Sequence, residues 1–169
     1  GFPLLLLLFA VPVPEWLLSR SVYLLQAGSA EATEALFKLI GIPFYRSGFD
    51  FMLPTVTIRI AEECSGIRST LALLLTSAAA GHLFLKSNLG TVFLCILTIP
   101  VSILKNGFRI ATLSYLGMYV DPGFLYGWLH RQGGIVFFLL GLLLTALVLV
   151  VLRKLERPPR HRHPGLELP

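Results

Sequence analysis

Residues 134–152 read GIVFFLLGLLLTALVLVVL, a run of 19 positions without a charged side chain. A helix of that length is about 28 Å long, close to the roughly 30 Å thickness of the hydrocarbon core of a bilayer. Two further apolar runs, 65–83 and 90–108, have a similar length and carry few charges. The sequence therefore predicts three membrane-spanning helices.

The composition of the whole chain agrees with this prediction. Of its 169 residues, 55% are hydrophobic and 14% are charged, whereas soluble domains average about 45–50% apolar and about 25% charged residues. The net charge is +5, but several basic residues follow the last apolar run directly. They are Arg153, Lys154, Arg157, Arg160 and Arg162. Such a cluster is typical of a cytoplasmic flank that contacts anionic lipid headgroups, and we do not expect nucleic-acid binding.

The part of the chain before the three spans predicts a mixture of elements. Residues 2–11 are apolar but too few to span, and the absence of an initiator Met suggests a fragment with membrane helices upstream. Residues 16–40 have helical periodicity with interspersed charges, which indicates an amphipathic helix. Residues 41–61 read as short strands around Gly and Pro, and such a β-hairpin must lie outside the hydrocarbon or be buried in protein.

The expected fold is thus an all-α polytopic membrane protein, a transmembrane helix bundle with a small exoplasmic β-hairpin element. We expect one transmembrane domain over residues 1–152 and a basic cytoplasmic tail over 153–169. Residues 111–129 are interrupted by Asp121-Pro122-Gly123, so each half is too short to cross. We expect the segment to enter and return on one side or to lie along the interface.

This topology gathers three chemically interesting residues on one side of the membrane. The start of the first span, the end of the second and the start of the third carry Cys64, Arg109 and His130, respectively. Lys86 and the basic tail lie on the opposite side. With a cytoplasmic tail, the trio is exoplasmic in a multi-pass protein of the cell membrane.

The stretch around Cys64 carries the strongest chemical signal. A thiol at the N-terminus of a helix is exposed to the positive end of the helix dipole, which favours the thiolate. Arg68 adds a cation one turn later, and Ser65 and Gly66 permit another backbone to come close. The alternative is that Cys64 is simply a small apolar residue that opens a helix, with Glu62 and Glu63 as partners of the helix dipole.

The second span ends in a pair of polar residues, Asn106 and Arg109, one helical turn apart on one face. A guanidinium at the membrane surface can donate to an oxyanion or bind a carboxylate. Alternatively, Arg109 extends towards the headgroups, as basic residues at helix ends commonly do. We expect that behaviour of Lys105.

His130 is the one histidine on the Cys64 side of the predicted topology. It is a candidate general acid and base for a cysteine nucleophile. It could instead cap the last helix or belong to the interfacial aromatic belt with Tyr126 and Trp128.

Taken together, these motifs resemble the exosortase/archaeosortase family. The resemblance rests on AEECSGIRS at 61–69, on Asn106-x-x-Arg109 and on His130 with a glycine three residues later. Family members often carry an acidic residue after the histidine, where this chain has Arg131. Asp121 or Glu62 could orient His130 instead.

The resemblance implies a membrane cysteine transpeptidase with Cys64, Arg109 and His130 as its catalytic residues. Glu62, Ser65, Gly66, Arg68 and Asn106 would support the site or bind substrate. The implied substrates are exported proteins whose C-terminus carries a short motif, a membrane helix and basic residues. A lipid-linked acceptor is a possible second substrate, and no metal or cofactor is expected.

Two other classes of function remain open on the sequence. A non-catalytic membrane binding or scaffold protein would have a Cys64 thiol of ordinary reactivity. A small transporter would need ionisable groups within its spans, whereas those of this chain collect at one face. A thiol oxidoreductase is disfavoured because there is no Cys-x-x-Cys motif.

Overall fold

The computed structural model describes residues 13–121, 123–126 and 128–156, except the side chains of 63, 64, 125, 126 and 128–133. The elements run along the chain in the order α2 (Glu15–Ile40), β1 (Tyr45–Ser47), β2 (Asp50–Met52), β3 (Thr57–Arg59), the short 3₁₀ helix η1 (Glu62–Ser65), α3 (Ile67–Phe84), α4 (Asn88–Tyr119), α5 (Gly123–Tyr126) and α6 (Trp128–Leu155).

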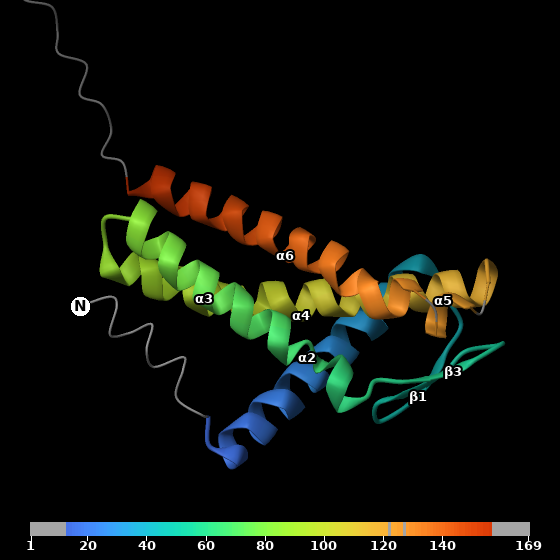
Figure 1. The fold of residues 1–169 in the computed structure, drawn as a ribbon. Helices are drawn as coiled ribbons and strands as arrows, with labels where there is room; N and C mark the ends of the chain where they lie inside the picture. Colours follow the sequence, from blue (N-terminus) through green and yellow to red (C-terminus); the bar gives the residue numbers. More distant parts are fainter. Residues whose placement is uncertain (1–12, 122, 127, 157–169) are drawn as a thin grey trace, which may run out of the picture.

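Three helices are long and apolar enough to cross a membrane, namely α3, α4 and the part of α6 from Gly134 to Leu155. They correspond to the three predicted spans and confirm the fold class. Figure 1 shows α3, α4 and α6 side by side, with α2 crossing the bundle obliquely. The charged helix α2 is not among the candidate spans.

Small and hydroxylated side chains allow α3 and α4 to pack closely. Ser77 of α3 and Thr98 of α4 share a buried hydrogen bond of 2.7 Å. Gly81 lies directly against Thr91 of α4, and a Cβ placed there would come within 2.6 Å of its methyl group. Such contacts are characteristic of helix association in lipid, where apolar side chains gain little from mutual burial.

The predicted boundaries of the second and third spans need correction. Helix α4 continues to Tyr119, well past the predicted end at residue 108, because no helix-breaking residue intervenes. Helix α6 begins at Trp128, before the predicted start at residue 134. The segment 111–129 is therefore not a separate element. Its first half belongs to α4, and α5 and the beginning of α6 follow.

The strand region forms a three-stranded antiparallel sheet in the order β1-β2-β3. The expected β-element is present, and the tight turn at Gly48, which has a positive φ of 62°, divides its first run into two strands. Phe51 and Ile60 pack with Phe37 of α2 and Ala111 of α4 in a buried apolar cluster. The sheet is thus fixed to α2 and to the C-terminal part of α4.

Ion pairs reinforce the junction between α2 and the sheet. Arg46 of β1 pairs with Glu31 and Glu34 of α2, and Lys38 pairs with Glu34 at 2.6 Å. The hydrogen bonds from Lys38 and Arg46 lower the pKa of Glu34, against a smaller opposing effect of burial. The guanidinium of Arg46 also lies over the ring of Phe51, 5.5 Å from its centre.

Candidate functional site

The two ends of the helix bundle differ in what they carry. At one end the backbone N–H of Lys86, in the α3–α4 loop, donates to Oε2 of Glu156 just after α6, over 2.8 Å. The sheet, η1 and α5 lie at the other end, as Figure 1 shows. Since α6 runs back from that end, its first turn, which carries His130, begins beside them.

Cys64 lies in η1, immediately before the corner that leads into α3. Gly66 makes this corner in the left-handed conformation, with φ of 76°. Ser65 is buried, and its hydroxyl accepts a weak hydrogen bond of 3.4 Å from the backbone N–H of Ile67. The predicted position of Cys64 just ahead of a helix N-terminus is therefore found in the backbone. Its side chain, like that of Glu63, lies outside the described residues.

Asn106 joins the corner to two other helices. It is 2% exposed, and its amide nitrogen donates to the Ser29 hydroxyl of α2 at 2.9 Å. The same amide group packs on Gly66, where an added Cβ would lie 3.3 Å from both Cγ and Oδ1. Asn106 therefore sets the separation between α2, α4 and the segment that carries Cys64.

Arg109 follows Asn106 on α4 by one helical turn, or about 4.5 Å along the axis towards the sheet end. Its side chain is half-buried. The structure thus brings the Cys64 segment against the turn of α4 that carries Asn106 and Arg109. The side chain of His130 lies outside the described residues.

The remaining predicted site residues lie around this corner. Glu62 is exposed at the start of η1, and Arg68 is exposed in the first turn of α3. Among the ion pairs of the described residues, none involves Glu62 or Arg68.

The prediction that Lys105 extends towards the headgroups is wrong. Its side chain is only 4% exposed and turns inwards, where Nζ donates to the Ser69 hydroxyl of α3 at 2.6 Å. The stem of Lys105 lies beside Gly141 of α6, at a point where an added Cβ would be 3.0 Å from Cδ. The side chain bends inwards because Gly141 leaves room for it and Ser69 offers an acceptor.

The family model described as transmembrane exosortase (Exosortase_EpsH) matches residues 1–147. The chain belongs to the transmembrane exosortase family. No curated protein and no solved structure matches the chain. Membership implies a membrane transpeptidase, generally of the cysteine type, and protein substrates of the PEP-CTERM type.

Several polar residues of α2 that support the exosortase corner were missed by sequence reasoning. Gln26 is buried and donates to the backbone carbonyl of Ile60, just ahead of η1. Ser29 accepts from Asn106, and Thr33 donates to the carbonyl of Ser29. Their spacing of three and four residues is a helical stripe, so a search for buried polar faces could have found them.

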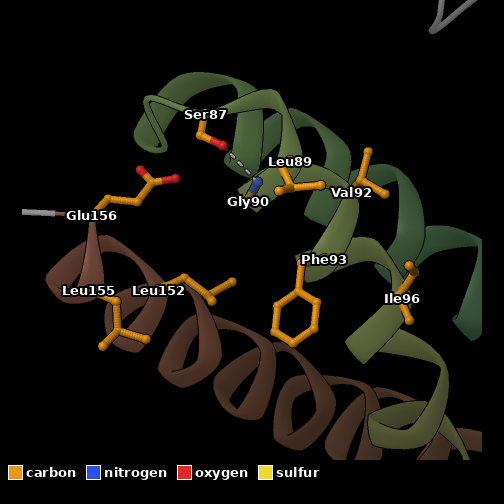
Figure 2. Close-up of a pocket in the computed structure, with 9 residues that line it drawn as sticks. All are labelled: Ser87, Leu89, Gly90, Val92, Phe93, Ile96, Leu152, Leu155 and Glu156. Carbon is orange, nitrogen blue, oxygen red and sulfur yellow. Dashed lines mark hydrogen bonds between the residues drawn. The ribbon is translucent and has the colours of Figure 1, made fainter.

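The groove drawn in Figure 2 lies at the opposite end of the bundle from this corner. It has a volume of about 440 Å³ and is lined mainly by apolar side chains of α4 and α6, together with Ser87 and Glu156. Because it is formed beside the α3–α4 loop, it does not adjoin the predicted catalytic residues.

Proposed function

We propose that this exosortase is a membrane-embedded cysteine protease and transpeptidase that cleaves the C-terminal sorting signals of exported proteins. The observation that carries the proposal is the packing of the Gly66 corner on Asn106, one helical turn from Arg109. This contact supports the proposal because it joins the segment that carries Cys64 to the part of α4 that carries Arg109.

Cys64 acts as the nucleophile in the proposed reaction. Its position ahead of α3 favours the thiolate because the N-terminal end of a helix is positive. The thiolate attacks the carbonyl carbon of the scissile peptide bond, and the carbonyl oxygen becomes an oxyanion. Arg109 stabilises that charge, a contribution of about 3–4 kcal/mol for a typical oxyanion donor.

His130 completes the proposed reaction by moving protons. As an imidazolium it donates its proton to the leaving amine while the C–N bond breaks, which leaves a thioester on Cys64. The neutral imidazole then takes the proton of the incoming nucleophile, which is an amine, a lipid-linked acceptor or water. Collapse of the second tetrahedral intermediate releases the product and restores the thiolate.

An apolar groove lined in part by Phe108, the residue before Arg109, supports a substrate that is itself embedded in the membrane. Residues of α2, α4 and α6 line a hollow of about 490 Å³, among them Ala32, Phe108 and Leu140. Confinement of the substrate's tail helix to the same bilayer fixes the depth of its cleavage point, which reduces the orienting that the enzyme must do. We place the site on the exoplasmic side of the cell membrane.

Co-expression of the full chain with a tagged substrate tests the proposal. We expect Cys64→Ala to stop removal of the substrate tail while the protein still inserts, and Cys95→Ala to process normally. The Cys64 thiol should also react with an alkylating reagent at pH values well below about 8.5, the pKa of an ordinary cysteine. Normal processing by Cys64→Ala would exclude Cys64 as nucleophile, and an ordinary alkylation profile would favour a scaffold protein.

A further inference from the structure

Lys105 is a buried cation that has no role in the reaction proposed above. Its ammonium donates to Ser69 at 2.6 Å, and its stem is enclosed between α3, α4 and α6. Among the residues whose side chains the structure describes, no carboxylate pairs with it. Ser102, one turn earlier on α4, is also buried, and its hydroxyl has no hydrogen-bond partner among the described residues.

Burial of an ammonium group costs free energy, because the charge loses its hydration. Charged groups within membrane helices face the protein interior and commonly mark functional sites. Replacement of a buried charge by an apolar side chain of similar volume is often neutral or stabilising, so stability alone does not account for a lysine here.

The contacts of Lys105 lead directly to the corner that follows Cys64. The Ser69 hydroxyl, which accepts from Lys105, donates to the carbonyl of Gly66 at 2.9 Å. That carbonyl also accepts from the backbone N–H and the hydroxyl of Thr70. The two hydrogen bonds from Thr70 already fix the Gly66 carbonyl, so Lys105 is not needed to hold the corner in place. Its positive charge, however, is supplied by no other residue of this hydrogen-bond network.

We propose that Lys105 is a positioning residue of the reaction, which through Ser69 holds a positive charge beneath the Gly66 corner and thereby favours the anionic form of Cys64. This inference rests on the proposed function, in which Cys64 is the nucleophile. Lys105 complements Arg109: one cation lies inside the bundle below the corner, and the other lies a helical turn further along α4.

A serine–lysine dyad, the other chemistry that this pair brings to mind, fits the geometry less well. In such a dyad the lysine accepts the proton of the serine hydroxyl. Here the Ser69 hydroxyl proton is directed to the Gly66 carbonyl, and Lys105 is the donor to Ser69. Ser69 therefore connects Lys105 to the corner and does not act as a nucleophile.

The test compares four variants of the full chain in lipid nanodiscs, all in a Cys95→Ser background. Lys105→Met removes the charge and the hydrogen bond, Lys105→Gln removes the charge but keeps a donor, and Lys105→Arg keeps both. Lys86→Met, at the opposite end of the bundle, is the matched control. Each variant is assayed for the alkylation rate of Cys64 by iodoacetamide at pH 7 and for kcat and KM of tail removal.

We expect alkylation and kcat to fall about tenfold in Lys105→Met and Lys105→Gln, the change in thiolate fraction that one pKa unit produces. Lys105→Arg should restore both rates, and Lys86→Met should match the parent. Parent-like alkylation in either uncharged variant, or failure of Lys105→Arg to restore it, would overturn the inference. If one of the two uncharged variants does not fold, the alkylation rate of the other still decides the test.

Two further variants separate this inference from the proposed function. If Cys64→Ala still removes the tail, the proposed function fails, whereas the alkylation rates still decide the effect of Lys105 on the thiol. If Ser69→Ala abolishes processing as completely as Cys64→Ala, Ser69 is the nucleophile and the inference is wrong. We expect Ser69→Ala to lose less activity than Lys105→Met.

Discussion

At the scale of single residues, Gly66 is the position on which the site geometry depends most. Its φ of 76° is costly for any residue with a side chain, and its Cα faces the Asn106 amide. The two constraints can be separated because Gly48, in the β1–β2 turn, has a similar φ of 62° with nothing near its missing Cβ.

We expect Gly66→Ala to destabilise the protein by more than the roughly 1–2 kcal/mol that a left-handed conformation costs an alanine. Gly48→Ala should lose only the stability that the left-handed backbone conformation costs, and it should process substrate normally. Thermal unfolding in detergent and the tail-removal assay check both variants. Equal unfolding temperatures and equal activities of the two would show that the contact with Asn106 is unimportant.

Glu34 makes the stability of the α2–sheet junction depend on pH. Because Lys38 and Arg46 lower the pKa of Glu34 from its ordinary value of 4.5, the ionised carboxylate stabilises the fold. This stabilisation is present above 4.5 and is lost as the pH falls through the lowered folded-state pKa. Unfolding temperatures of the parent and Glu34→Gln should therefore differ at pH 6 and converge once the pH has fallen below that lowered pKa.

Glu15→Gln, at the exposed start of the same helix, serves as the control for this measurement. It removes one carboxylate from α2 without touching Arg46. A constant gap between the parent and Glu34→Gln from pH 6 to pH 3 would contradict the role assigned to the Glu34 ion pairs.

The sequence allowed some residues to be placed better than others. The backbone position of Cys64 could be predicted because the first apolar run begins beside it, and Asn106 could be assigned to the second helix because it lies within the second run. Lys105 was misplaced because the direction of a long flexible side chain depends on its neighbours, here Ser69 of α3 and Gly141 of α6. Local sequence contains no information on those two contacts.

At the scale of elements, the crossing of α2 and α4 is set by a glycine. A Cβ at Gly107 would come within 2.6 Å of Cβ of Ala32 and within 3.2 Å of the Ala32 and Thr33 backbone. No flexible side chain can move aside there, so any substitution must push the two helices apart. Such a displacement would also stretch the bond between Asn106 and Ser29.

We expect Gly107→Ala to cost about 1–3 kcal/mol, as overpacking of a tight contact typically does. Gly134→Ala, in α6, is the matched control because nothing lies within 4 Å of its missing Cβ. The control should be more stable to unfolding than the parent by about 0.5–1 kcal/mol, because alanine has a better helix propensity than glycine. Unfolding of both purified variants measures the difference, and equal stability would mean that α2 and α4 are not in close contact.

The elements themselves were largely predictable, and their ends were not. Long apolar runs fix the number of spans because the bilayer thickness sets a minimum length. The end of α4 at Tyr119 was missed because the prediction stopped the helix where the membrane should end. Helices continue until a breaker or a cap ends them, whether or not lipid surrounds them.

At the scale of the whole molecule, a membrane-spanning α3 would place the sheet and the α3–α4 loop on opposite sides of the membrane. Ser47 of β1 and Lys86 of the loop are both exposed and suit cysteine labelling. In a Cys64→Ala, Cys95→Ser background, a membrane-impermeant thiol reagent should label Ser47→Cys in intact cells. Lys86→Cys should be labelled only after the membrane is permeabilised, and labelling of both in intact cells would contradict three spans.

The length of α4 has a consequence for how far from the lipid a peptide bond can be cut. Its 32 residues extend about 48 Å, some 18 Å more than the hydrocarbon core. Arg109 lies about 31 Å from the start of the helix, and the turns beyond it pack against the sheet through Ala111. In the proposed reaction, a depth close to the thickness of the hydrocarbon core would restrict cleavage to peptide bonds near the membrane end of a substrate's anchor helix.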